Sequence, residues 1–200
     1  MLLHAPRERA IRDALNARLN EPGTALIDEL GIKHGDFRVD ICAITHELHG
    51  YEIKSDQDTL SRLPAQAKHF SLVFHRMTLV VGPKLLGPAL AIVPPWWGIW
   101  LATVDDDGLA RFAELREAGP NPQPNYRWVV RLLWRDELHA CLRAVGARGY
   151  SKLKYWEVAN MMLKTFTPEE LTVLVARILR DRKGQECTDW SATDNSTWDE

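Results

Sequence analysis

An alternation of apolar and polar residues on both sides of a turn, within residues 38–55, most strongly constrains how this chain folds. The period of two predicts two β-strands joined as a hairpin, with successive side chains on opposite faces of a sheet. We expect the apolar members to face the core: Val39, Ile41, Tyr51 and Ile53. Asp40, Glu52 and Lys54 then share the opposite face, together with Cys42.

Two carboxylates and one ammonium group on adjacent strands form a compact charged cluster. Carboxylate oxygens are ligands that suit Mg²⁺, and a nearby ammonium group suits a phosphate. The same three side chains could equally form an exposed salt-bridge triplet, which contributes little to stability. Their spacing alone does not decide between a metal site and a salt-bridge triplet.

The composition of the 200-residue chain is ordinary for a soluble globular protein, with 46% hydrophobic and 26% charged residues. No apolar run approaches the roughly 18 to 20 residues that cross a bilayer, and the first residues lack the apolar core of a signal peptide. We therefore expect a cytoplasmic protein that does not enter a membrane. The cysteines Cys42, Cys141 and Cys187 are widely spaced and predict free thiols.

The N-terminal part is predicted to alternate helices and strands. Ile11, Leu15 and Leu19 recur every four residues and mark an amphipathic helix over residues 7–20, and a strand over 24–32 precedes the hairpin. The later elements are a helix from Pro64 to about His75, a strand over 77–81, a helix over 84–92 broken at Gly87-Pro88, a strand over 98–104 and a helix over 109–117. This order predicts an α/β fold, a mixed sheet flanked by helices on both faces.

A proline-rich segment, residues 119–126, predicts a stiff linker after a sheet domain in residues 1–118. The residues that follow, 127–183, are predicted to form short helices. They hold 12 Lys and Arg against 6 Asp and Glu, whereas residues 184–200 hold 5 acidic residues and no basic ones. We therefore expect a small, basic, all-helical C-terminal domain followed by a disordered acidic tail.

The arrangement around the hairpin resembles the PD-(D/E)XK nuclease superfamily. A helix and a strand precede the strand with Asp40, and Glu52-Ile53-Lys54 lies on the next strand, as in the signature of that superfamily. The following helix carries Gln66, similar to the QxxxY motif of the branch that contains RecB-type exonucleases, with Phe70 in place of the tyrosine.

A longer stretch, residues 50–64, resembles a family of small bacterial and phage proteins assigned to the same superfamily. Residues 96–99 and 133–137 are similar to that family as well, so the resemblance extends over roughly residues 7–183. It implies a restriction-endonuclease-like fold for the sheet domain.

The resemblance also implies a metal-dependent nuclease that hydrolyses phosphodiester bonds, with DNA as the expected substrate. Asp40 and Glu52 would hold Mg²⁺ or Mn²⁺, with the backbone carbonyl of Ile53 as a third ligand. The cation would neutralise part of the negative charge that builds up during hydrolysis. Lys54 would position the attacking water or stabilise that charge. Asp40, Glu52 and Lys54 are thus the predicted catalytic residues.

Several further residues are predicted to support this centre. Glu29 lies on a strand face that can reach it, and Glu8 matches the position where many members of the superfamily place an additional acid. We expect both as accessory metal ligands. Gln66 is expected to bond near the cluster or to contact the phosphate backbone, and Arg38 and Arg62 are further candidates for binding the substrate.

Other functions stay open at the level of sequence. The chain could be a catalytically inactive module that binds nucleic acid or protein, although such a module gains nothing from two adjacent carboxylates that repel each other. It could also be a ribonuclease, because no pattern here indicates how the 2′-OH would be read. The basic helices could contact a phosphate backbone or simply face solvent. A homodimer is compatible with the sequence.

Overall fold

The computed structural model describes residues 5–32 and 35–182. Its centre is a six-stranded mixed sheet in the order β1-β2-β3-β4-β5-β6, which confirms the predicted mixed sheet. The strands are β1 (Ala25–Ile32), β2 (Phe37–Ile44), β3 (Leu48–Lys54), β4 (Arg76–Val81), β5 (Gly98–Val104) and β6 (Ala110–Arg116). The first three strands pair antiparallel, β4 and β5 run parallel to β3, and β6 returns antiparallel to β5.

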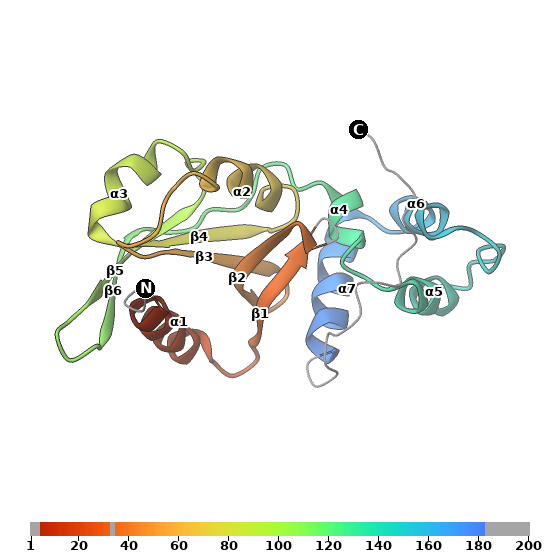
Figure 1. Ribbon diagram of the computed structural model, residues 1–200. Coiled ribbons are helices and arrows are strands. Elements are labelled where there is room, and N and C mark those ends of the chain that lie inside the picture. Colours follow the sequence, from red (N-terminus) through yellow and green to blue (C-terminus); the bar gives the residue numbers. More distant parts are fainter. Residues whose placement is uncertain (1–4, 33–34, 183–200) are drawn as a thin grey trace.

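Helices cover both faces of the sheet (Figure 1). The helices of this part are α1 (Ala5–Leu19), α2 (Leu63–Phe70) and α3 (Pro83–Leu90). On the α1 side, Ile11 and Leu15 are buried and pack with Ile53 of β3, as the four-residue spacing predicts. On the other side, Phe70 of α2 and Trp97 belong to a second and larger buried cluster. The α/β architecture with helices on both faces is therefore confirmed.

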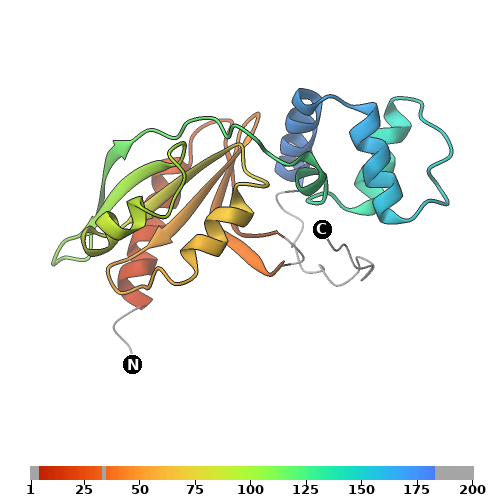
Figure 2. The same ribbon diagram turned by 90° about the horizontal axis from the view of Figure 1, so that it is seen from above.

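Four short helices pack beside one end of the sheet (Figures 1 and 2). They are α4 (Tyr126–Val130), α5 (Arg135–Ala144), α6 (Tyr155–Thr165) and α7 (Pro168–Asp181). The start of α7 is fixed by a capping box in which Thr167 and Glu170 exchange hydrogen bonds of 2.8 and 3.2 Å. Val129 and Val175 of these helices lie in the same buried cluster as Phe74, so the helical part shares a core with the sheet. The division of the chain into two domains stays a prediction.

The segment predicted as a linker has no helix or strand up to residue 125, and α4 begins at its last residue, Tyr126, but the segment is tied to the sheet part. The Asn121 backbone N–H donates to the carbonyl of His75 at 2.7 Å, and its side-chain amide donates to the carbonyls of Ser71 and Phe74 at 2.7 and 2.8 Å. The predicted acidic tail, residues 184–200, lies outside the described residues. No helix among those described is long and apolar enough to cross a bilayer.

Residues 109–117, predicted as a helix, contain β6 instead. A turn at Asp105 and Gly108 precedes it, and Gly108 takes a φ of 82°, a conformation that favours glycine. Phe112 then packs against Trp100 of the neighbouring strand, with ring centroids 6.1 Å apart. The helix prediction was wrong because Ala, Glu, Leu and Arg favour a helix locally, whereas pairing with β5 decides the structure.

Two helix predictions also need correction. α2 ends at Phe70 rather than near His75, because the residues after it turn to bury Phe74 completely. α3 continues through Pro88 to Leu90 without the predicted break. The proline removes one backbone donor from the helix, and the rest of this short helix still forms.

The hairpin is confirmed, since β2 and β3 pair antiparallel, but its faces are divided differently from the prediction. Ile41 and Ile53 pack on the α1 side, whereas Val39 belongs to the cluster on the opposite side. Cys42, expected beside Asp40 on a polar face, is fully buried in that same cluster. The prediction failed because helices cover both faces, and because the side-chain alternation of β2 changes next to Asp40.

Candidate functional site

A polar cleft of about 340 Å³ lies between α1, the hairpin of β2 and β3, and the start of α2. It is lined by every residue that the sequence predicts for the site: Glu8, Glu29, Arg38, Asp40, Glu52, Ile53, Lys54, Arg62 and Gln66. Gly35, Asp36 and Asp58 complete the lining. The fold thus brings together side chains from two helices and three strands.

Asp40 lies where β2 and β3 separate. Backbone pairing between the two strands ends at Ile41 and Tyr51. Beyond that pair, Asp40 Oδ2 accepts a hydrogen bond from the N–H of Ile53 at 2.6 Å. The Asp40 side chain therefore replaces the backbone ladder at this point, and it fixes the carboxylate beside the segment Glu52-Ile53-Lys54.

Glu52 is the most deeply buried acid of the cleft, with 2% of its surface exposed. Its Oε1 accepts hydrogen bonds from Lys54 Nζ and from Gln66 Nε2, both at 2.5 Å. Burial, together with the negative charge of Asp40, raises the pKa of Glu52 to about 7, although Lys54 and Gln66 act in the opposite direction. The exposed salt-bridge triplet that the sequence left open does not describe this carboxylate.

Two oxygens at the base of the cleft are buried without a hydrogen-bond partner among the described residues. They are Glu52 Oε2 and Gln66 Oε1. An oxygen buried in this way destabilises the folded protein, because it has lost its hydrogen bonds with water and forms none with the protein. Lone pairs of this kind are what a divalent cation or an ordered donor would satisfy.

The accessory acids lie at the edge of the cleft and are about half exposed, with side-chain values of 44% for Glu8 and 50% for Glu29. In the β1–β2 register, Asp28 pairs with Ile41 and Leu30 with Val39, which places Glu29 opposite Asp40. Glu29 has a φ of 53°, an uncommon conformation for a residue with a side chain. Glu29 thus lines the cleft from the edge strand of the sheet.

Arg12 of α1 is part of the site although the sequence analysis missed it. Its guanidinium contacts three acids, with NH2–Oδ1 at 2.6 Å to Asp40, NH1–Oε1 at 3.1 Å to Glu29 and NH2–Oε1 at 3.3 Å to Glu8. Partial burial alone would lower the Arg12 pKa, but these carboxylates raise it above its ordinary value. One signal could have pointed to Arg12: it lies four residues after Glu8, on the helix face next to buried Ile11.

A family model described as Bacteriophage P4 protein cII matches residues 8–197. The chain belongs to this family. Over 82 residues it is 34% identical to Protein cII of Enterobacteria phage P4, an alignment that covers 39% of this chain and 31% of that relative. The chain therefore matches less than a third of the length of its curated relative. No solved structure matches the chain.

The arginines predicted to bind substrate lie at the mouth of the cleft of this cII-family protein. Arg38 and Arg62 are exposed, and within the described part of the chain neither forms an ion pair with the acids of the site. Their positive charges are thus open to a ligand from solvent.

Across residues 5–32 and 35–182, no group of three or more His, Cys, Asp or Glu side chains is arranged to hold a metal ion. The ligand set that the sequence predicts is of another kind, with two side-chain carboxylates, Asp40 and Glu52, and the backbone carbonyl of Ile53. In this cII-family chain each of those carboxylates is paired with a cationic side chain, Asp40 with Arg12 and Glu52 with Lys54.

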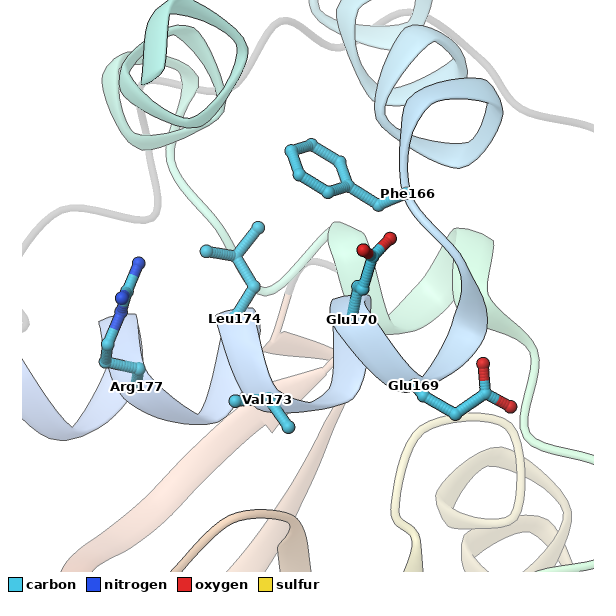
Figure 3. A pocket seen from close by; sticks show the side chains of 6 residues that line it. All are labelled: Phe166, Glu169, Glu170, Val173, Leu174 and Arg177. Carbon is cyan, nitrogen blue, oxygen red and sulfur yellow. The ribbon is translucent and has the colours of Figure 1, made fainter. Parts of the chain in front are cut away.

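A second cavity, of about 440 Å³, differs in character from the polar cleft. It lies along α7, and Phe166 and Leu174 extend into the same space (Figure 3). Glu169, Glu170, Val173 and Arg177 complete its lining. Because most of this surface is apolar, the cavity suits packing of an apolar group, although two glutamates belong to its lining.

Proposed function

We propose that this cII-family protein is a metal-dependent nuclease that hydrolyses phosphodiester bonds in DNA. One observation carries the proposal: Asp40 is hydrogen-bonded to the backbone of Ile53, at the centre of Glu52-Ile53-Lys54, while Gln66 is bonded to Glu52. Four groups from β2, β3 and α2 thus converge on one cleft. Ion pairs on a protein surface form without such convergence of groups from three elements.

The topology supports a restriction-endonuclease-like fold for the sheet part. Helix α1 is followed by the antiparallel strands β1, β2 and β3, then by α2 and the parallel strand β4. Asp40 lies on the second of these strands and Glu52-Ile53-Lys54 on the third. This order is the one implied by the resemblance to PD-(D/E)XK nucleases.

The residues of the cleft fit Mg²⁺ or Mn²⁺. Asp40, Glu52 and the carbonyl of Ile53 would hold the ion, because all three present oxygen atoms, which hard divalent cations prefer. Glu52 Oε2, which no described residue hydrogen-bonds, supports this assignment, since a cation would satisfy it. The bound cation would supply positive charge that offsets the negative charge developing on the phosphate.

The other residues of the cleft have roles that follow from their contacts. Lys54 Nζ lies 2.5 Å from Glu52 Oε1, so its charge is fixed next to the carboxylate, where it would stabilise the negative charge that develops on a bound phosphate. Gln66 holds Glu52 in one orientation through its amide hydrogen bond. Arg38 and Arg62 bind the neighbouring phosphates of the substrate at the mouth of the cleft.

The charge distribution supports a nucleic acid as the substrate. Residues 127–183 hold 12 Lys and Arg against 6 Asp and Glu, a net charge of +6 in a chain whose total is −2. A basic segment next to a sheet that carries the cleft suits contact with a phosphate backbone.

The proposal is tested by incubating the purified full chain with linear duplex DNA, circular duplex DNA, single-stranded DNA and RNA, in Mg²⁺, Mn²⁺ or EDTA. We expect DNA cleavage with either cation, none in EDTA and none by Asp40→Asn. Asp107→Asn is the matched control, because Asp107 is an exposed acid in the turn before β6, outside the cleft. Its activity should equal that of the unmodified protein.

Three other results would change the conclusion. Equal cleavage by Asp40→Asn would show that the reaction takes place elsewhere. Cleavage of RNA but not of DNA would show that the substrate is RNA. Binding of DNA without cleavage of any substrate would favour the inactive binding module.

A further inference from the structure

Arg12 occupies the centre of the acid cluster. Besides its contacts with Asp40 Oδ1, Glu29 and Glu8, its NH1 donates to the backbone carbonyl of Asp40 at 2.9 Å. Its side chain is only 20% exposed. The guanidinium therefore binds both the backbone carbonyl and the side chain of Asp40. Only a planar group with several N–H donors can reach both acceptors in this way.

Electrostatics gives this contact a consequence for metal binding. Glu8, Glu29, Asp40 and Glu52 line one cleft, and their negative charges repel one another. Arg12 offsets this repulsion in the absence of a metal ion. The same positive charge disfavours a divalent cation beside Asp40, because two cations would then share one carboxylate.

We propose that Arg12 is a positioning residue that holds Asp40 in place and sets the affinity of the site for its divalent cation. This inference rests on the proposed metal-dependent function. Arg12 acts as an internal counterion, so a cation held by Asp40 would compete with the guanidinium for this carboxylate. Binding of the cation alone is therefore weak. A bound substrate strengthens binding of the cation, because its phosphate restores the negative charge that Arg12 has neutralised.

The test measures Mn²⁺ binding to the metal-free full chain by calorimetric titration, for the unmodified protein, Arg12→Gln and Arg12→Met. Removal of one positive charge from the cleft is expected to tighten Mn²⁺ binding on the order of 10-fold. Arg9→Gln is the matched control, because Arg9 lies on the same helix and pairs with Asp13 on its exposed side, at 3.7 Å. That variant should bind Mn²⁺ as the unmodified protein does.

Unchanged or weaker Mn²⁺ binding by folded Arg12→Gln or Arg12→Met would overturn the counterion role and leave Arg12 as a structural brace. Failure of both variants to fold, judged by circular dichroism, would also contradict it. Mn²⁺ binding by the unmodified protein without DNA cleavage would refute the nuclease and leave the counterion role intact. Absence of Mn²⁺ binding by the unmodified protein and by both Arg12 variants would refute both.

Discussion

The buried carboxylate of Glu52 gives a prediction about stability and pH. Burial and the neighbouring Asp40 raise its pKa from 4.5 to about 7, so the ionised form is unfavourable in the folded protein. A shift of this size corresponds to about 3 kcal/mol. Because the folded pKa lies above the unfolded pKa, the cost is absent below pH 4.5, grows between pH 4.5 and 7, and is complete above pH 7.

Glu52→Gln removes this titration while keeping the size of the side chain. The free energies of unfolding of the variant and of the unmodified protein are measured with urea, in EDTA, at pH 5 and pH 8. The difference, variant minus unmodified protein, should be about 2 kcal/mol larger at pH 8 than at pH 5. The ion pair with Lys54 needs the ionised carboxylate, so its contribution is already part of the pKa of Glu52, whereas effects of the substitution on packing are the same at every pH in this range. The change with pH, rather than the absolute difference, is therefore the quantity to compare.

Saturating Mg²⁺ provides the control for this experiment. A cation in the cleft stabilises the ionised carboxylate, so Mg²⁺ should stabilise the unmodified protein most at pH 8 and should have little effect on Glu52→Gln. A free-energy difference that does not change between pH 5 and pH 8 would refute the reasoning, because Glu52 would then ionise equally easily in the folded and unfolded chain.

Two further predictions concern packing outside the cleft. Gly98→Ala should lower the free energy of unfolding by at least about 2 kcal/mol in urea, because an added Cβ would lie 2.9 Å from the backbone nitrogen of Ala118. Gly87→Ala should raise the free energy of unfolding by about 0.5 to 1 kcal/mol, because a Cβ there would meet no atom of the described residues within 4 Å. Equal effects would contradict the packing of β5. Arg182→Lys should lower the thermal midpoint and destabilise the protein by about 3 kcal/mol, because lysine cannot form the two hydrogen bonds that the buried arginine donates to Glu137. A midpoint within about 1 or 2 °C of that of the unmodified protein, as for a surface substitution, would argue against that contact.

Local patterns were sufficient to predict the parts of the fold that depend on periodicity. Alternation around Ile41 and Ile53 predicts the hairpin, and the four-residue spacing of Ile11 and Leu15 predicts the helix that packs on it. The predicted helix over residues 109–117 failed, because Ala, Glu, Leu and Arg suit an exposed helix as well as an edge strand. Pairing with β5, which involves residues that follow the Gly108 turn, settles the outcome.

The site shows the same division between local and long-range information. Glu52 and Lys54 lie on one strand, so their proximity follows from the strand period, and Asp40 follows from the hairpin. Arg12 is 28 residues from Asp40, and only the packing of α1 against the sheet brings the two together. The raised pKa of Glu52 could not be predicted either, because it arises from burial in the folded structure and from the charge of Asp40 on the neighbouring strand.

The rate of cleavage of linear duplex DNA by Lys54→Ala tests the central claim most directly. Lys54 is next to Glu52 but is not a predicted metal ligand, so the variant keeps the ligands of the cation and, with one positive charge fewer in the cleft, should bind Mn²⁺ at least as tightly as the unmodified protein does. Its cleavage rate should fall at least about 100-fold. Lys68→Ala, which changes an exposed lysine of α2, is the control and should cleave normally. Cleavage by Lys54→Ala at the rate of the unmodified protein would contradict the account.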